Sequence, residues 1–212
     1  MPGPGVSGLT TGTSQTVAPV CRDCVWWQSR GNRTASKQRW IERAEEESGE
    51  WGSIYLDEHG RLLGSLQYGP SYLFPRAADL PAGPASDDAA LVTCLYLLRG
   101  ATGWVEKSLL LAAIGESRDR GRTALEAFAY RYPEHETQEE RFLVHRTVFP
   151  RDFLDEFGFA TLRSQGRVDL CRLELGGLQA VEEGRRAKVL RVVQDAFTPT
   201  PVPIPRPRRT SS

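Results

Sequence analysis

The stretch LLRGATGWVEKSLLLAAI, residues 97–114, decides how the rest of this sequence is interpreted. It leaves an apolar segment, passes through a turn that contains glycine, and enters a predicted helix. This is the layout of a phosphate-binding loop, in which the free N–H groups of a helix N-terminus hold an anion. Trp104 and Glu106 stand in that turn, however, where a bulky side chain blocks the approach of a phosphate and a carboxylate repels it.

Length and composition limit the classes of protein to consider. A chain of 212 residues predicts one domain, and 27 Lys plus Arg against 27 Asp plus Glu give no basic field for nucleic acid. No segment approaches the roughly 18 apolar residues of a membrane span. The first residues have neither the basic start nor the hydrophobic block of a secretory signal. We therefore expect a cytoplasmic protein with neither nucleic acid nor membrane as partner.

Both ends of the chain differ in composition from its middle. Residues 1–18 are rich in Gly, Ser, Thr and Pro, which predicts a disordered lead. Residues 198–212 form a proline-rich basic tail, expected to be solvated and extended, with docking onto an aromatic groove or an acidic surface as the alternative. The folded domain is therefore expected over residues 19–197.

Helices and strands are mixed between these ends. The strand predicted over residues 89–98 is apolar almost throughout, as in a central strand covered on both faces. These elements predict an α+β fold with a mixed sheet of six or seven strands flanked by helices. The other predicted elements are an amphipathic helix over 36–51 capped by Ser36, a hairpin over 52–69 that turns at His59 and Gly60, a helix ending near Gly121, a strand over 123–130, a short helix over 150–158, strands over 159–164 and 168–175, and a C-terminal helix over 178–197.

The order of these pieces resembles the GCN5-related N-acetyltransferase superfamily, in particular a group of small actinobacterial acetyltransferase-like proteins that open with C-x-x-C-V-[FW]-W. The resemblance covers roughly residues 20–195. The matching pieces are CRDCVWW (21–27), WG (51–52), QYGPSYLFPRA (67–77), the apolar strand before RGATG (99–103), RTALEAFA (122–129) and FPRDFLDEFGF (149–159).

The resemblance implies a strongly twisted mixed sheet whose two central strands splay apart. The pantetheine arm of acetyl-coenzyme A would lie in the gap, and its pyrophosphate would lie on the N-terminus of the next helix. A backbone N–H near Leu97 or Leu98 would stabilise the oxyanion. The cofactor-binding residues expected on this basis are Leu97, Leu98, Arg99, Gly100, Gly103, Trp104, Val105, Lys107 and Ser108.

Two departures from the family pattern bear on activity. The family loop reads [QR]-x-x-G-x-[GA], and one register places Ala101, Trp104 and Glu106 at its three diagnostic positions. The other register puts Arg99 at the basic position, needs one or two extra residues in the loop, and leaves Gly100 and Gly103 as turn glycines. The second departure is Leu154, which stands where many members have a Tyr that protonates the departing thiolate.

Two residues are candidates for catalysis, each with a structural alternative. Glu126 is the only acid in an apolar strand, where burial would raise its pKa toward that of a general base; otherwise it is the partner of an arginine or an edge residue facing water. Tyr68, with Tyr72, flanks a loop that could line the acceptor pocket, and packing in the core or at the rim is the alternative.

The cysteines do not predict a metal site. Cys21 and Cys24 form a lone C-x-x-C, while zinc needs about four ligands and His59, His135 and His145 are scattered. A redox pair would need a different local setting. We therefore expect both cysteines in the first strand and its entry.

These observations predict an acetyl-coenzyme A-dependent N-acetyltransferase acting on a small-molecule or peptide amine. The alternative is a catalytically degenerate member that serves as a binding or regulatory module. An open turn beside Gly103 would favour the enzyme, and Trp104 filling the gap between the splayed strands would favour the module. A third hypothesis is that the protein binds an acyl-coenzyme A with a longer acyl group, which predicts a deep apolar channel near Tyr68 and Phe74. A large apolar face on the C-terminal helix would indicate a homodimer.

Overall fold

The computed structural model describes residues 5–31, 35–101, 103–132, 137, 141–142 and 147–177. The chain divides into two units after Gly177. The predicted C-terminal helix and the proline-rich tail belong to the second unit and lie outside the described residues. Within the described ranges no helix is long and apolar enough to cross a membrane.

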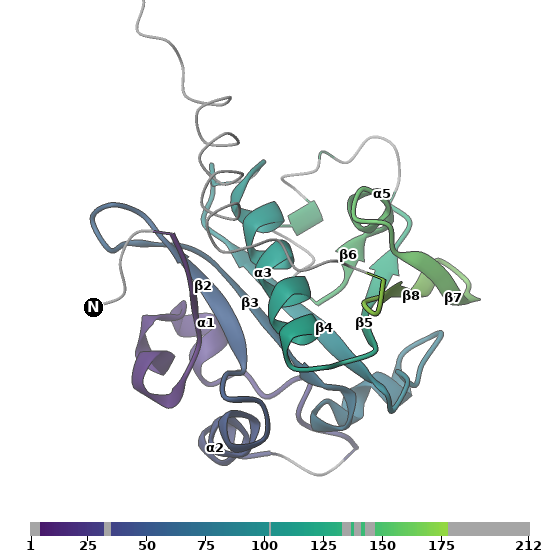
Figure 1. Cartoon of the computed structure of the whole chain (residues 1–212), viewed down its shortest axis with the longest axis horizontal. Coiled ribbons are helices and arrows are strands. Elements are labelled where there is room, and N and C mark those ends of the chain that lie inside the picture. The colour runs from purple at the N-terminus through teal and green to yellow at the C-terminus, as the bar shows by residue number, and fades with distance from the viewer. Residues whose placement is uncertain are drawn as a thin grey trace, which may run out of the picture. The chain divides into compact units, whose positions relative to one another are not determined.

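The first unit is built on a single mixed sheet (Figure 1). Its strands run in the order β1-β2-β3-β4-β5-β8-β7, and the short β6 pairs with β5. Only the β4–β5 and β5–β6 pairs are parallel. The α+β prediction is confirmed, with eight strands in place of six or seven. The strands are β1 Gly5–Gly8, β2 Gly52–Leu56, β3 Leu62–Pro70, β4 Ala89–Leu97, β5 Ala124–Tyr130, β6 Phe149–Pro150, β7 Ala160–Gln165 and β8 Val168–Glu174. The helices are α1 Pro19–Arg22, α2 Lys37–Ser48, α3 Val105–Asp119 and α5 Arg151–Asp155, with 3-10 turns η1 Thr11–Thr16, η2 Ser71–Leu73 and η3 Pro75–Asp79.

The strands that were not predicted are β6 and β1, and β1 corrects the prediction of a disordered lead over residues 1–18. Gly5–Gly8 pairs antiparallel with β2, and η1 follows it. Leu9 beyond the strand is buried, with 1% of its surface exposed. Because an edge strand is held by main-chain hydrogen bonds, a segment of Gly and Ser can form one without an apolar pattern.

The segment around the two early cysteines is also different from the prediction. Cys21 lies in α1 and Cys24 in the turn that follows, so neither belongs to a strand. Pro19 at the first position of α1 is the local reason, because its fixed φ favours a helix start. Trp27 carries this segment into the core, where 1% of its surface is exposed.

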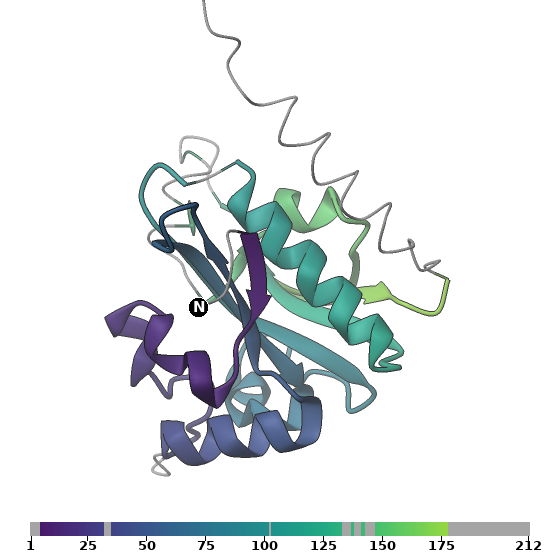
Figure 2. The same ribbon diagram turned by 60° about the vertical axis from the view of Figure 1, so that its left-hand side comes forward.

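Two apolar clusters cover the two faces of the sheet. One joins α3 to alternate residues of the central strands, such as Leu66, Leu95 and Leu97. The other joins the N-terminal segment and α2 to residues that point the opposite way, such as Ile54 and Leu91. Figure 2 shows α3 along one side of the sheet and α1 and α2 gathered away from it. The central strand is therefore covered on both faces, as its apolar sequence predicted.

The parallel strands β4 and β5 separate along their length, as the family resemblance implied. Their pairing begins at Ala89–Ala124 and ends at Val92–Ala127. Beyond that point β5 pairs with β6 through Ala129. The β3–β4 register also shifts at Gln67 and Tyr68, which is a β-bulge at the level where the split opens.

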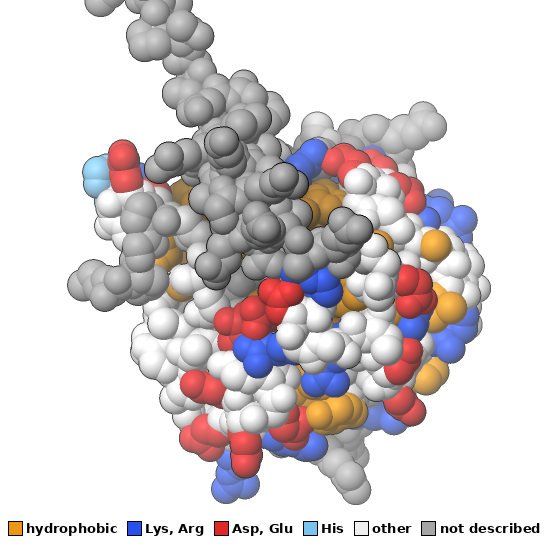
Figure 3. All heavy atoms as spheres, viewed as in Figure 1, with side chains coloured by type: hydrophobic (Ala, Val, Ile, Leu, Met, Phe, Trp, Pro, Cys, Tyr) orange, Lys and Arg blue, Asp and Glu red, His pale blue; other side chains and the backbone are white. Residues whose placement is uncertain are grey.

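Acidic and basic side chains are interspersed over the described part of the face seen in Figure 3. Some charged residues of the chain form exposed ion pairs with residues four positions away, such as Arg43–Glu47 and Arg120–Glu116. Such exposed pairs contribute little to stability. The described charges on this face therefore indicate neither an acidic nor a basic macromolecular partner.

Candidate functional site

The free edge of β4 is the first feature of the candidate site. The Leu98 N–H donates to the Leu63 carbonyl of β3 at 2.8 Å. Because successive peptide groups of a strand point to opposite sides, the N–H groups of Leu95 and Leu97 face the split. Of the two residues expected to stabilise the oxyanion, Leu98 is therefore already bonded to β3, and Leu97 faces the gap.

The turn between β4 and α3 is held by the two predicted glycines. Gly100 has φ +82° and Gly103 has φ +109°, which are conformations that favour glycine. A Cβ at either position would meet no atom within 4 Å, so the turn is open beside both of them. Arg99 is exposed next to Gly100. This arrangement corresponds to the register in which Arg99 takes the basic position.

Trp104 does not enter the split. Its ring packs edge-on against Tyr55 of β2, with 4.6 Å between the ring centroids. Strand β2 lies two strands from β4, roughly 10 Å at ordinary strand spacing. Trp104 thus covers the α3 face of the sheet and leaves the gap between β4 and β5 to other groups.

The side chain of Glu106 places a carboxylate of the protein itself in the turn before α3. Its Oε1 accepts a hydrogen bond from the Gly103 N–H at 2.5 Å, and its carboxylate also accepts from its own backbone N–H. The side chain is buried, and Oε2 has no hydrogen-bond partner among the described residues. Burial raises the pKa of this carboxyl, and the two backbone hydrogen bonds oppose that rise.

The remaining predicted cofactor residues stand around the start of α3. Val105 is fully buried in the core. The Ser108 N–H donates to the Trp104 carbonyl at 2.9 Å, so it is committed to the helix. Lys107 Nζ lies 2.6 Å from Glu156 Oε2 near α5, and this ion pair partly neutralises it. Among these three residues, only Lys107 can reach a bound anion with its side chain.

A cavity of about 170 Å³ lies on the sheet face opposite α3. Its walls come from the N-terminal segment, from the start of α2, and from β3 and β4 through residues such as Gln67 and Cys94. Leu95 and Tyr96 bring it to the free part of β4, and Thr147 lies just before β6. The cavity therefore reaches the split from the side opposite the turn that leads into α3.

Lys37 is the one charged residue in the described wall of this cavity. Its Nζ lies 4.5 Å from the ring centre of Trp40 and 5.2 Å from that of Trp51. Burial lowers the pKa of this amine to about 8. The sequence did not reveal Lys37 because the first residue of an amphipathic helix is normally solvated; here the N-terminal segment folds over it.

Two indole N–H groups at the same cavity are unsatisfied. Trp27 and Trp51 line the cavity and are almost fully buried, and neither Nε1 has a hydrogen-bond partner of ordinary geometry in the described part of the chain. The indole of Trp27 lies against the thiol of Cys94, which is a weak acceptor. Trp40 differs, since its Nε1 donates to the Leu73 carbonyl at 2.9 Å.

The thiols at this cavity are not arranged around a metal. Cys21, Cys24 and Cys94 all line it. Burial raises the pKa of Cys94 to about 12, so this thiol stays protonated near neutral pH. Within the described residues, no three His, Cys, Asp or Glu side chains come together as a metal site.

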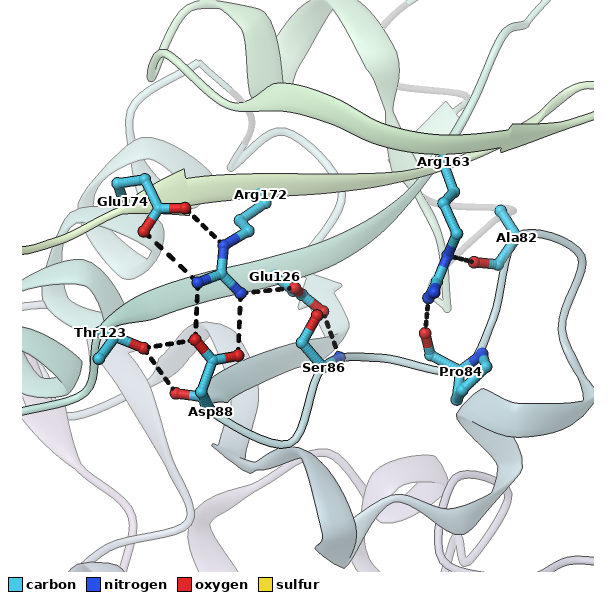
Figure 4. Close-up of polar contacts among 9 residues, drawn as sticks. All are labelled: Ala82, Pro84, Ser86, Asp88, Thr123, Glu126, Arg163, Arg172 and Glu174. Atoms are coloured by element: carbon cyan, nitrogen blue, oxygen red, sulfur yellow. Dashed lines mark hydrogen bonds and ion pairs between the residues drawn. The ribbon is translucent and has the colours of Figure 1, made fainter.

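Glu126 lies where β4 and β5 are still paired, and its carboxylate is fully engaged (Figure 4). Oε1 accepts from Arg172 at 3.0 Å, and Oε2 accepts from the Ser86 N–H at 2.8 Å. Arg172 also binds Asp88, and these hydrogen bonds, together with one from Thr123, lower the pKa of Asp88 to about 2. The geometry therefore supports the second interpretation of Glu126, a structural residue that pairs with an arginine. It does not support a role as general base.

Tyr68 is likewise directed away from the cavity. Its hydroxyl donates to Glu50 Oε1 at 2.6 Å, and burial raises its pKa well above the ordinary value. Tyr72 is exposed and binds Glu47. Neither these residues nor Phe74 line the cavity, so the expected acyl channel beside them is not the one found. Leu154, in place of the family Tyr, is fully buried.

Comparisons with known proteins give similarity only at the level of solved structures. No family model and no curated protein matches the sequence. A PaiA N-acetyltransferase of Thermoplasma acidophilum, solved with coenzyme A, is 16% identical, with a TM-score of 0.49 over 80% of this chain and 97% of that one. A GCN5-related N-acetyltransferase of Kribbella flavida is 15% identical, with a TM-score of 0.48 over 80% and 96%. An N-acetyltransferase of Staphylococcus aureus Mu50 is 14% identical, with a TM-score of 0.48 over 80% and 97%.

Proposed function

We propose that this protein is a GCN5-related N-acetyltransferase that transfers an acetyl group from acetyl-coenzyme A to an amine. The strongest support is the position of the edge of β4 that pairs with no described strand beyond Val92. One end of this edge lies at the turn before α3, which has space beside its glycines, and the cavity on the opposite sheet face reaches the same edge. Sites of this kind lie where a sheet is interrupted and backbone groups are exposed. A donor and an acceptor could thus meet beside Leu95 and Leu97 from opposite sides.

The chain offers separate groups to each part of the donor. The N–H and C=O groups of Leu95 and Leu97 would bind the amide-rich pantetheine arm as an added strand binds a sheet edge. Arg99 and the space beside Gly100 and Gly103, where an added Cβ would meet no atom, would receive the pyrophosphate. Glu106 weakens that second contact, since its carboxylate already binds the Gly103 N–H.

The reaction then needs little from side chains. The neutral amine attacks the thioester carbonyl carbon, the C–N bond forms, the C–S bond breaks, and coenzyme A leaves as the thiolate while the amine loses a proton to solvent. A backbone N–H of β4 would stabilise the oxyanion. Entry into a largely apolar cavity without a carboxylate lowers the pKa of the amine and favours its neutral form. Leu154 supplies no acid, but a thiol with a pKa of about 8.5 can leave unassisted.

The test is product formation from acetyl-coenzyme A and a panel of amines, followed by chromatography with mass detection. A thiol reagent would be a poor readout because the chain has four free cysteines. The proposal predicts acetylated amine and free coenzyme A in equal amounts. Hydrolysis alone, or no turnover with any amine class, would contradict it.

A second candidate function is a binding module with an impaired coenzyme A site. The hydrogen bond between Glu106 and Gly103 favours it, because this internal carboxylate sits where a pyrophosphate would otherwise be held. Calorimetric titration with acetyl-coenzyme A separates the two functions. Binding by the natural protein supports the enzyme. Binding only by Glu106→Gln supports the module, and Glu42→Gln on the exposed face of α2 is the control for loss of an acid elsewhere.

A further inference from the structure

The cavity behind the split carries a chemical signature that narrows the acceptor. Its described wall contains no Asp or Glu, and its charged group is Lys37. Lys37 forms no ion pair within the described ranges, and its ammonium lies over the faces of Trp40 and Trp51. A partly desolvated cation without a counter-ion is unfavourable, and a negatively charged ligand would relieve it.

The other polar groups at this wall leave Lys37 as the donor that a ligand can reach. The Nε1 atoms of Trp27 and Trp51 are buried away from the cavity surface, and that of Trp27 lies against the Cys94 thiol. Gln67 Oε1, an acceptor at the wall, already receives Gln28 Nε2 at 3.2 Å and Thr93 Oγ1 at 3.1 Å. The group at the described wall that lacks an ion pair is therefore the Lys37 ammonium, which calls for an anionic ligand.

The size of the cavity limits the rest of the ligand. About 170 Å³ is comparable to a cavity of roughly 150 Å³ that holds benzene. Leu9, Val17 and Val20 give it apolar walls. It can take a short aliphatic or aromatic body together with a small anionic group, and it is too small for a folded peptide segment.

We propose that the cavity binds a small amine that also carries a carboxylate, seated against Lys37. This inference rests on the proposed function for the fate of the amine, while binding itself needs no donor. The proposal predicts that polyamines are not preferred acceptors, because their second ammonium group would lie near Lys37 and the described wall has no acid to pair with it.

The experiment compares matched probes with the full-length protein in the absence of acetyl-coenzyme A. Aliphatic α-amino acids from alanine to leucine carry the carboxylate, 3-methylbutylamine is leucine without it, and putrescine is a diamine. Binding is measured by calorimetry and by tryptophan fluorescence, since Trp27 and Trp51 line the cavity. We expect at least one amino acid to bind tenfold or more tightly than both amines. Failure of every amino acid to bind at millimolar concentration, or equal binding of 3-methylbutylamine and leucine, would overturn the proposal.

Variants of Lys37 locate the carboxylate. Lys37→Met removes a partly desolvated cation, so it should fold as well as the natural protein and lose the preference for the amino acid. Lys37→Arg keeps the charge and should keep the preference. Arg39→Met removes an exposed cation two residues further along and is the control. An unchanged preference in a folded Lys37→Met would place the anion elsewhere and overturn the assignment.

Proton exchange on ligand binding is a measurement that Lys37 would not affect if its role were only structural. The titratable groups that face Lys37 are the thiols of Cys21 and Cys24 and, from β4, that of Cys94. An anion beside Lys37 raises its pKa from about 8, so binding at pH 8 should take up as much as about half a proton more in the natural protein than in Lys37→Met, and at pH 6.5 the two proteins should differ by almost none. Calorimetry in two buffers of different ionisation enthalpy measures this difference, in which a proton lost by the ligand amine cancels. Equal proton exchange by the natural protein and Lys37→Met at pH 8 would contradict the assignment. Since acetyl-coenzyme A is absent, failure here is distinct from failure of acetyl transfer.

Discussion

Glu106 Oε1 accepts a hydrogen bond from the backbone N–H of Gly103 at 2.5 Å, three residues before it in the chain. The turn before α3 therefore carries an anion of its own at a helix N-terminus. Helix N-termini favour a negative charge whatever its source. A bound phosphate must compete with this carboxylate.

The pKa of Glu106 gives the first prediction. Because burial raises this pKa, the folded protein holds the proton at pH values where the unfolded chain has lost it. This group therefore makes the free energy of unfolding fall as pH rises from about 4.5 through the folded pKa. Glu106→Gln should remove that part of the fall, as measured by urea unfolding between pH 4.5 and 7. A parallel pH dependence in the two proteins would show that Glu106 titrates normally.

Tyr68→Phe should reduce stability and leave turnover intact. The change removes the hydrogen bond to Glu50, a half-buried carboxyl whose pKa burial already raises, and should cost about 1–3 kcal/mol in urea unfolding. Tyr72→Phe is the control, because its hydroxyl binds Glu47 at the surface and its loss should cost under about 1 kcal/mol. A large loss of turnover with unchanged stability would instead return Tyr68 to the catalytic machinery.

Arg172→Met should be the most destabilising of these changes. It leaves Glu126 buried without its cation, for an expected loss of about 3–5 kcal/mol. Glu126→Gln keeps an acceptor for the Ser86 N–H and should lose less. It should also retain acetyl transfer within about twofold, since Glu126 lies in the paired part of β5. Abolished transfer in a stable Glu126→Gln would show that the residue is a base after all.

The sequence predicted the centre of the fold because that part is specified locally. The apolar run of β4, the glycines of the turn and the amphipathic α2 with its Ser36 cap all appear where expected. Strand β1 was missed since its pairing uses main-chain groups that any sequence possesses. The early cysteines were placed in a strand although Pro19 marks a helix start.

The candidate site was harder to predict because it is assembled from distant segments. The burial of Glu126 was predicted correctly from its apolar neighbours, but Arg172 lies 46 residues further along and decides its role. Lys37, Trp27 and Trp51 have no local pattern that joins them. Only the folding of the N-terminal segment over β3 and β4 places them at one cavity.

Amide hydrogen exchange on β4, followed by NMR with and without acetyl-coenzyme A, tests the central claim most directly. The claim is that the donor binds along the free edge of β4, so the amides of Leu95 and Leu97 should exchange about 2- to 10-fold more slowly in its presence. Leu98, already bonded to Leu63, should be unchanged and serves as the internal control. Unchanged exchange at Leu95 and Leu97 with saturating acetyl-coenzyme A would contradict the account.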